Sequence, residues 1–446
     1  MVRIEAMANR LFGLDRRELM AGLGAAILGP ALPGIAATDG RRLLTLQAQA
    51  GTLTLRPDAP GFPIWSLQGP AQEADFRFKR GDELEISLLN ELPIPVVLNW
   101  HGIDGVPAAA PLAVRPALSA GAKEKLAIPL HQAGTLMCDL RLLGDGQARP
   151  SRALGVIIGE SEAPAVDRDE LFLIEDWRLR PDGIAIAPGI DPEGAAAVYT
   201  INGLATVDIP MRIHERLRLR FINGCQRNVI AIKMEEQDVR VMALDGQPAE
   251  PFRARNGALV LAPGGRIDAF IDATAPPGST SAILLHDGRE ARPIARLVTS
   301  PEPPLRAAPL AAAPPLPSNG LPARLELKGA LRFEVALGGA QAGWVQPANF
   351  AASAAPVFRA RSGRVVVLAL INRGEMATVF HLHGHHFRVL DRLDDGWKPY
   401  WLDTLAIEPG QTQRIAFAAE YAGRWLIESV ATDWAAPRLV RWYSVE

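Results

Sequence analysis

Short runs in which apolar and polar residues alternate, broken by Gly, Pro, Asn and Asp, make up most of the chain beyond residue 40. They include LTLQAQAGTLTL, DELEISLLN, RLRLRFING, RVVVLALINR and QRIAFAAEYAGRWLIE. Successive side chains of a strand point to opposite faces, so a period of two predicts strands that rest on a core. No long amphipathic helix stands out. The pattern predicts an all-β fold of sandwich type.

One phrase recurs three times, as FKRGDELEISLLN, RIHERLRLRFING and FRARSGRVVVLALIN. Each copy is a strand that ends in asparagine and precedes a second strand, which is the mark of a repeated module. The recurrence predicts three homologous sandwiches, over residues 38–163, 164–300 and 325–446. Residues 301–324 between them are rich in proline and alanine, which cannot form a regular sheet, and are predicted to be a connector.

The N-terminus reads as a targeting segment. Arg16 and Arg17 precede a mildly apolar run and then small residues around Ala36 and Ala37, a pattern that resembles a twin-arginine export signal over residues 1–37. A membrane anchor is disfavoured because the run is too short to span about 30 Å of hydrocarbon. The chain is therefore predicted to reach the periplasm as a folded protein with no transmembrane anchor after cleavage.

The formal net charge of the 446 residues is -2, and 22% of the residues are charged. This balance predicts no binding to nucleic acid or to an anionic membrane surface. The chain has only two cysteines, Cys138 and Cys225, which exclude a disulfide framework. They can form one bridge or remain two buried thiols, and the sequence leaves both possibilities open.

Half of the eight histidines stand in the stretch VFHLHGHHFRVL, as His381, His383, His385 and His386. In an extended strand the first three would project to one face, which suits metal ligation because imidazole is the commonest metal ligand. A polar seam that hydrogen-bonds neighbouring loops would use the same spacing. The stretch alone does not decide between the two.

With the segments NWHGIDG, QAGTLMCDLRL and FHLHGHHF, the chain resembles the multicopper oxidases of three cupredoxin domains, a family that includes the laccases. INGLATVDIP, VMALDGQPAEP and LAPGGRIDAF resemble scaffold segments of its middle domain. The resemblance covers nearly all of the mature chain and implies three consecutive cupredoxin-like Greek-key sandwiches. It also implies a type 1 copper that accepts electrons and a trinuclear copper cluster that reduces dioxygen to water.

At most of the positions where this resemblance implies copper ligands, other residues stand. The type 1 cysteine corresponds to Ser429 and its two histidines to Thr378 and Trp434, with Leu439 at the axial place. Of the eight trinuclear histidines, three are kept, namely His101, His381 and His383. The other five positions hold Asn99, Asp139, Arg141, Glu428 and Val430. His385 matches a non-ligand histidine of the family, and His386 is an additional surface or network residue.

Two hypotheses follow from the exchanged residues. In the first, the Arg141 guanidinium pairs with Asp139 and Glu428, replaces the metal charge and holds the first and third domains together, so that no cofactor is bound. In the second, the three remaining histidines, with Asp139 or Glu428 as a further ligand, hold one copper, zinc or iron ion. A fixed cation at Arg141 would oppose that ion.

The function expected first is that of a copper-free periplasmic scaffold or binding protein, similar to the copper-free cell-division member of this family. Its partner would be a periplasmic or cell-envelope protein, and the chain itself is expected to be a monomer. The alternative is an oxidoreductase or metal-binding protein with a residual mononuclear site. Four-copper laccase activity is not expected, because it depends on ligands that these positions lack.

The remaining titratable candidates are expected to have no special role. Asp403 and Glu420 are predicted to be solvated carboxylates at turns or edges. Three isolated histidines are predicted to lie at the surface or in turns, namely His131, His214 and His286.

Overall fold

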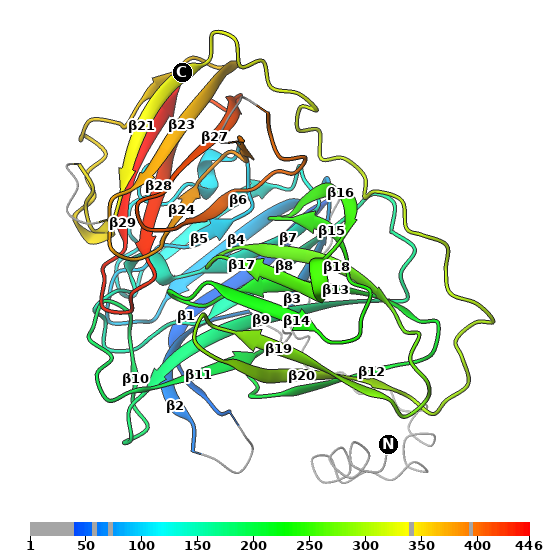
Figure 1. Cartoon of the computed structure of the whole chain (residues 1–446). Coiled ribbons are helices and arrows are strands. Elements are labelled where there is room, and N and C mark those ends of the chain that lie inside the picture. The colour runs from blue at the N-terminus through cyan, green and yellow to red at the C-terminus, as the bar shows by residue number, and fades with distance from the viewer. Residues whose placement is uncertain (1–39, 56–59, 70–74, 339–342, 392–395) are drawn as a thin grey trace, which may run out of the picture. The chain divides into compact units, whose positions relative to one another are not determined.

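The computed structural model describes residues 40–55, 60–69, 75–338, 343–391 and 396–446 (Figure 1). The predicted export signal, residues 1–37, lies outside these residues. Within them, no helix combines the length and the apolar character that a membrane crossing requires.

The first pair of sheets is built from β1 to β8. One sheet has the order β2 (Phe62–Gln68), β1 (Arg41–Leu53), β4 (Glu83–Asn90), β6 (Lys123–Pro129). The other has the order β3 (Asp75–Lys79), β8 (Ala153–Gly159), β7 (Gly134–Asp139), β5 (Asn99–His101). Alternate residues of β4 are buried, as the sequence pattern predicts, and those side chains meet the second sheet in a common core. The short 3-10 helices η1 (Pro107–Ala109) and η2 (Arg141–Leu143) lie in the connections.

The second pair of sheets holds β9 to β20. One follows the order β10 (Ala185–Ile186), β9 (Arg168–Leu179), β13 (Arg216–Asn223), β18 (Arg266–Asp272), β15 (Arg240–Leu244), β16 (Gln247–Arg253), and β11 (Ala196–Ile201) also pairs with β9. The other follows the order β12 (Val207–Met211), β20 (Ala291–Thr299), β19 (Thr280–His286), β14 (Ile230–Met234), β17 (Ala258–Leu261). The 3-10 helix η3 (Arg255–Gly257) leads into β17. A single apolar core joins the two sheets.

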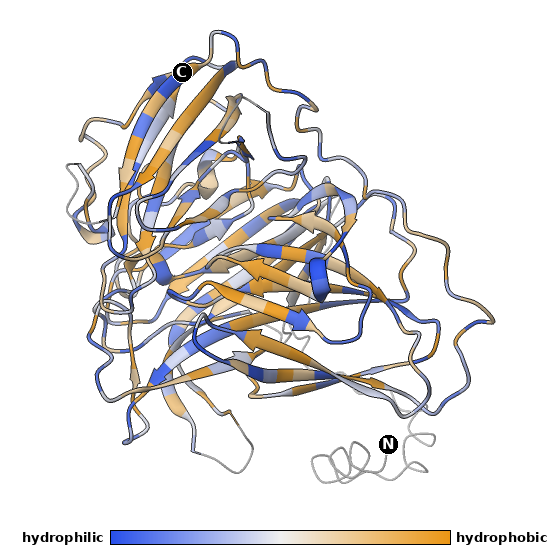
Figure 2. Cartoon of the chain, in the orientation of Figure 1, coloured by the Kyte–Doolittle hydropathy of each residue, from blue (hydrophilic) through white to orange (hydrophobic). Residues whose placement is uncertain are grey.

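The third pair holds β21 to β29. One sheet has the order β21 (Leu331–Leu337), β23 (Arg364–Asn372), β27 (Thr412–Ala419), β25 (Arg388–Val389). The other has the order β22 (Arg359–Ala360), β29 (Leu439–Val445), β28 (Gly423–Ala431), β24 (Thr378–Leu382), β26 (Thr404–Ile407), and η4 (Pro347–Asn349) is a short 3-10 helix. Their shared core again takes residues from both sheets. Hydrophobic residues recur along the strands of all three sandwiches (Figure 2).

The recurring asparagine makes the same turn in each sandwich. Asn90, Asn223 and Asn372 are the last residues of β4, β13 and β23, and each is fully buried. Each side-chain Nδ2 donates to two carbonyls of the following segments, and each Oδ1 accepts from the N–H two residues on. The sequence repeat therefore marks a structural unit, because one buried amide closes the same turn three times.

Strand β13 departs from simple alternation, because all eight of its residues are buried. Arg218 and Arg220 on its polar face both pair with Asp268, at 2.6 and 3.0 Å. Arg220 also donates to the Thr135 hydroxyl of β7, at 2.9 Å. The polar face of β13 is thus the contact between the first and second sandwiches rather than a solvated surface.

No strand forms between Thr299 and Leu331, in agreement with the proline- and alanine-rich composition of this segment. Leu316 in its middle is buried against Met242 and Phe270 of the second sandwich. The exact domain boundaries stay a prediction.

Candidate functional site

Four strands carry six of the eight positions that resemble the family's trinuclear ligands, and Arg141 and His383 lie just beyond the ends of two of these strands. β5 pairs with β7, which sets Asn99 opposite Asp139, and β24 pairs with β28, which sets His381 opposite Glu428. Residues from both strand pairs line one cavity of about 20 Å³. Such a cavity has room for about one water molecule. The sequence motifs therefore meet in space, although they lie far apart in the chain.

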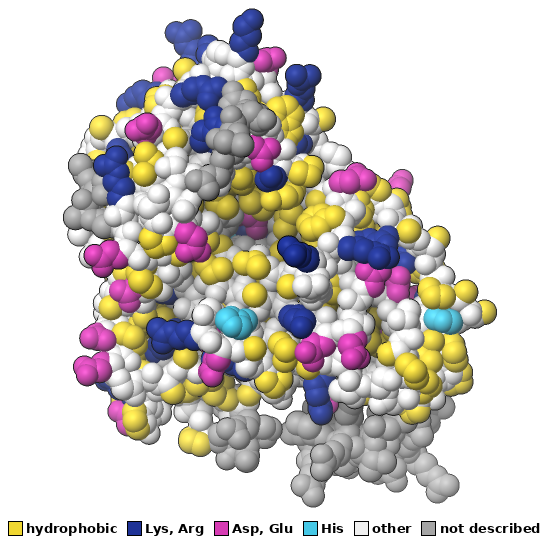
Figure 3. Space-filling view, in the orientation of Figure 1, with side chains coloured by type: hydrophobic (Ala, Val, Ile, Leu, Met, Phe, Trp, Pro, Cys, Tyr) yellow, Lys and Arg dark blue, Asp and Glu magenta, His cyan; other side chains and the backbone are white. Residues whose placement is uncertain are grey.

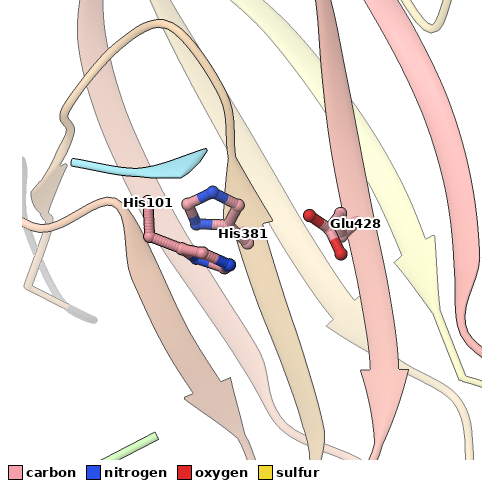
Figure 4. A group of neighbouring side chains, drawn as sticks. All are labelled: His101, His381 and Glu428. Carbon is pink, nitrogen blue, oxygen red and sulfur yellow. The ribbon is translucent and has the colours of Figure 1, made fainter. Parts of the chain in front are cut away.

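His101, His381 and Glu428 line this cavity and lie near one another (Figure 4). The donor atoms of His101, His381 and Glu428 all lie within 4.8 Å of one another, and the two imidazole centroids are 4.2 Å apart. Burial and then the His381 ring lower the pKa of His101 well below its ordinary value. Burial and then His383 lower the pKa of His381 to about 3. Both rings are therefore neutral at pH 7 and each can present a nitrogen lone pair.

The tautomer of His381 follows from its neighbours. Its Nδ1 lies 3.1 Å from the carbonyl oxygen of Asp403, which can only accept, so Nδ1 carries the proton and Nε2 the lone pair. His381 Nε2 and His101 Nδ1 are both buried without a hydrogen-bond partner among the described residues. Such orphaned nitrogens in a polar cavity suit a bound water or a metal ion.

Glu428 is the most heavily engaged residue of the site. His383 Nε2 donates to its Oε1 at 2.7 Å, and the Arg438 guanidinium donates to its Oε2. Asn99 Nδ2 on the first sandwich also approaches Oε1, at 3.4 Å. Burial opposes ionisation, but Arg438 and then His383 outweigh it and hold the pKa of Glu428 well below its usual value. The carboxylate is therefore ionised and bound to a cation from its own domain.

The predicted pairing of Arg141 with Asp139 and Glu428 is wrong. The Arg141 guanidinium donates to Glu175 at 2.6 Å and to the Gly224 carbonyl at 2.5 Å, and only its backbone N–H reaches Asp139, at 2.9 Å. The reason is local: Arg141 is the first residue of η2, and the fully buried Glu175 of the second sandwich needs a cation. Arg141 therefore joins the first and second domains, not the first and third.

Asp139 lines the cavity, and no guanidinium of the described residues pairs with its carboxylate. Its Oδ2 lies 3.7 Å from His101 Nε2. Burial raises the pKa of Asp139, although Arg141 and Arg438 oppose that effect. The predicted polar network thus exists in part, and Arg438, which the sequence analysis missed, supplies its cation.

The positions that resemble type 1 ligands have other contacts. The Thr378 hydroxyl donates to Asn372 Oδ1 at 3.3 Å, and Ser429 is buried and stands opposite Phe380 in the sheet register. Trp434 donates from Nε1 to the Ala187 carbonyl at 3.1 Å. The Arg178 guanidinium lies 4.5 Å from the centre of the same indole. Trp434 therefore packs the third sandwich onto the second.

Both cysteines are free, buried thiols. Cys225 lines the cavity, whereas Cys138 stands opposite Trp100 in the register of β5 and β7. Burial raises the pKa of each thiol well above its ordinary value. Neither is a thiolate at pH 7, and of the two alternatives left open by the sequence the structure has the free thiols.

The four clustered histidines do not share one face. β24 ends at Leu382, and Gly384 turns the chain with a φ of +77°. His385 consequently points into the core of the third sandwich, where its Nδ1 lies 2.8 Å from the Tyr443 hydroxyl. His386 is buried, with Nδ1 2.7 Å from Asp104 Oδ2. It is a network residue and not a surface one.

A charged cluster that joins all three sandwiches was missed by the sequence analysis. Arg266 binds both carboxylate oxygens of Asp403, at 2.9 and 2.7 Å. Asp245 accepts from the backbone N–H groups of Arg266 and Asp403, and its carbonyl lies 2.8 Å from His386 Nε2. The prediction that Asp403 is solvated is wrong, because it is buried as the counter-ion of Arg266. Asp245 and Arg266 stand in VMALDGQPAEP and LAPGGRIDAF, the segments that resemble the family's scaffold. That resemblance was the sequence signal that could have pointed to the cluster.

The other isolated residues lie where the sequence placed them. Glu420, His131 and His286 are exposed, and His214 occupies a turn with a φ of +66°.

Comparison with known proteins gives a consistent result. Residues 169–290 and residues 324–446 each match a family profile described as multicopper oxidase, and the two segments together span more than half of the chain. The chain is 24% identical over 416 residues to the multicopper oxidase MmcO of Mycobacterium tuberculosis, a match that covers 78% of this chain and 76% of that protein. It is 26% identical over 244 residues to Laccase-6 of Oryza sativa subsp. japonica, which covers 48% of this chain and 39% of the laccase.

Solved structures share the fold. A multi-copper oxidase from Pseudomonas thermotolerans superimposes with a TM-score of 0.78 at 22% identity, covering 91% of this chain and 99% of that one. Lac15 from a marine microbial metagenome gives a TM-score of 0.73 at 21% identity, covering 90% and 99%. The all-β architecture of three cupredoxin domains is thereby confirmed.

Proposed function

Because the chain belongs to the multicopper oxidase family, we propose that it is an oxidase-like protein that does not hold the four coppers and acts as a copper-free binding or scaffold protein. Its place of action would be the periplasm, reached through the twin-arginine segment at Arg16 and Arg17. Its partner would be a protein of the periplasm or cell envelope.

The observation that carries the proposal is the ion pair of Glu428 and Arg438. A guanidinium lines the cavity where the resemblance implies copper, and the carboxylate beside it is already bound to this guanidinium and to His383. A cluster of copper ions in this cavity would be repelled by the fixed, buried guanidinium that lines it. The network supplies an internal charge balance in place of metal charge.

The donor set at the type 1 position supports the same proposal. A type 1 copper needs a thiolate and two imidazoles, whereas Ser429, Thr378 and Trp434 offer two hydroxyls and an indole N–H. The thiol that does line the cavity, Cys225, has a raised pKa and lies too far from the His101, His381 and Glu428 donor atoms to join their group. These residues do not fit the four-copper set.

Elemental analysis of the mature protein, exported under copper-replete conditions, tests the proposal together with its visible spectrum. We expect no stoichiometric metal, no thiolate-to-copper absorption, and the same circular dichroism before and after chelation. Four coppers per chain with an intense visible band would overturn it.

A single-ion site is the second candidate, and the two orphaned nitrogens of His101 and His381 favour it. The donor atoms of these two histidines lie close to a carboxylate oxygen of Glu428. His383 is not a member of this group, and its Nε2 is hydrogen-bonded to the Glu428 carboxylate. Two imidazoles and one carboxylate suit zinc or one copper ion. Zinc would then raise the melting temperature of the wild type and not that of His381→Gln, with the exposed His131→Gln as the matched control.

A further inference from the structure

A second cavity, of about 410 Å³, lies between the second and third sandwiches. Its volume is in the range of roughly 300–1,000 Å³ that ligand sites have. The walls come mostly from apolar residues of β15 to β18 on one side and of residues 400–406 on the other. Hydrophobic side chains also surround the hollow in the surface where these elements meet (Figure 3).

Two strand edges face this cavity. Every residue of β17, Ala258 to Leu261, lines it, and so do residues 404–406 of β26. Side chains of a strand alternate between two faces, so consecutive residues can line one space only if the edge of the strand is turned toward it. β17 and β26 are indeed the outermost strands of their sheets.

The backbone groups in the middle of both edges point into the cavity. The Thr404 N–H donates to Asp245 and not to β24, so the Ala406 N–H and C=O, two residues on, also point away from β24. The Ala258 N–H likewise donates to the Arg255 carbonyl, so the Val260 N–H and C=O point away from β14. Among the described residues, none outside its own sheet bonds to the backbone of Val260 or Ala406.

The opposite ends of the same two sheets are protected against strand addition, and these two edges are not. β12 carries Pro210, and β22 is only two residues long and begins with Arg359. Proline, charge and short length are the usual means of blunting an edge. β17 (ALVL) and β26 (TLAI) have neither a proline nor a charged residue.

The surroundings of β17 specify the chemistry of an occupant. Val260 and Phe252 line the cavity although 67% and 42% of their surfaces are exposed. Arg255 at the same rim is exposed and forms no ion pair with any described residue. The groove therefore offers hydrogen bonds along an edge, apolar contacts beside it and one uncompensated cation at its end.

We propose that this groove binds an extended, apolar peptide segment of a partner protein, which adds a strand to the β17 edge and places a carboxylate near Arg255. The Val260 N–H would donate to a peptide carbonyl and the Val260 C=O would accept from a peptide N–H, as in other cases of strand addition. The inference deepens the binding role proposed above and rests on it, because it names the class of partner.

Fluorescence anisotropy with the full chain tests the proposal. The probe is a labelled peptide of alternating threonine and valine that ends in glutamate, and its twin is methylated on alternate backbone nitrogens. We expect saturable binding of the probe, weakened about tenfold or more by backbone methylation and by Val260→Pro, since each removes a hydrogen bond. Proline is tolerated at an edge position whose N–H points outward. Arg255→Gln should weaken binding at low salt more than at high salt.

Three results would overturn the proposal. Equal binding of the methylated peptide would show that the peptide does not pair as a strand. Full displacement of the peptide by octanoate would assign the groove to small apolar acids. Loss of binding in Ala406→Pro alone would place the added strand on β26 and not on β17. Metal content measured on the same preparation separates the two proposals. If the chain is metal-free and does not bind the peptide, only the proposal of a peptide groove is refuted. If the chain holds four coppers and binds the peptide, only the proposed copper-free function is refuted.

Discussion

Replacement of His386 by glutamine should reduce stability by an amount that depends on pH. Burial opposes the charge of His386, but Asp104 and then Asp403 outweigh it and raise the pKa to about 9 from the ordinary 6.5, against a smaller opposing effect of Arg266. A gap of this size between the folded and unfolded pKa corresponds to about 3 kcal/mol. Below about pH 6.5 both states are protonated, so the contribution is fully present. Between about pH 6.5 and 9 the unfolded chain releases its proton first, and the contribution is lost.

Urea unfolding followed by tryptophan fluorescence measures this effect in the wild type and in His386→Gln. The difference in unfolding free energy should be about 3 kcal/mol near pH 6 and should shrink toward zero above about pH 9. Asp245, whose pKa is raised to about 6 by burial and then by Asp403, is present in both proteins, so the comparison removes most of its own titration. The exposed His131→Gln is the control and should show no difference. A loss in His386→Gln that stays constant from about pH 6 to 10 would refute the assignment of a charged His386.

The remaining predictions concern single contacts. Arg141→Met should destabilise the chain by about 3 kcal/mol in urea unfolding, because Glu175 loses one of its two cations; an unchanged midpoint would contradict the ion pair. Asn372→Ala should cost about 2–3 kcal/mol in the same assay, since the hydrogen bonds of its side-chain amide in a buried turn are lost. Asn372→Asp should cost at least as much, because a buried carboxylate oxygen would then face the Met376 and Ile407 carbonyls to which Nδ2 donates; a milder loss than in Asn372→Ala would contradict this role of Nδ2. Gly384→Ala should lower the melting temperature, because its φ is +77° and a Cβ would come within 2.2 Å of the Trp425 ring; unchanged melting would show that the turn adapts.

The small cavity at His101 and His381 and the larger groove along β17 are separate features of one scaffold. The first is a small polar space between strand pairs of the first and third sandwiches, and its chemistry is dominated by Glu428 and Arg438. The second is a larger apolar space whose walls include two open strand edges. The two proposals, for the small cavity and for the groove, can therefore be tested separately.

Local patterns in the sequence determined the strands and the number of sandwiches. A period of two needs only neighbouring residues to be read, and the recurring asparagine closes a turn through bonds to nearby segments, as at Asn90 and Asn372. The ligand motifs also predicted that His101 and His381 meet, because a resemblance carries spatial information about segments far apart in the chain. Their ring centroids are 4.2 Å apart.

Only the tertiary structure decided which charges pair. Arg141 and Arg438 are both arginines near the cavity, but the η2 turn directs Arg141 to Glu175 of another sandwich and leaves Glu428 to Arg438. Asp403 looked like a solvated turn residue until packing placed it beside Arg266. The physical reason is the same in each case: a side chain's partner depends on the direction in which the fold turns it and on what remains unpaired nearby, and neither is a property of the neighbouring sequence.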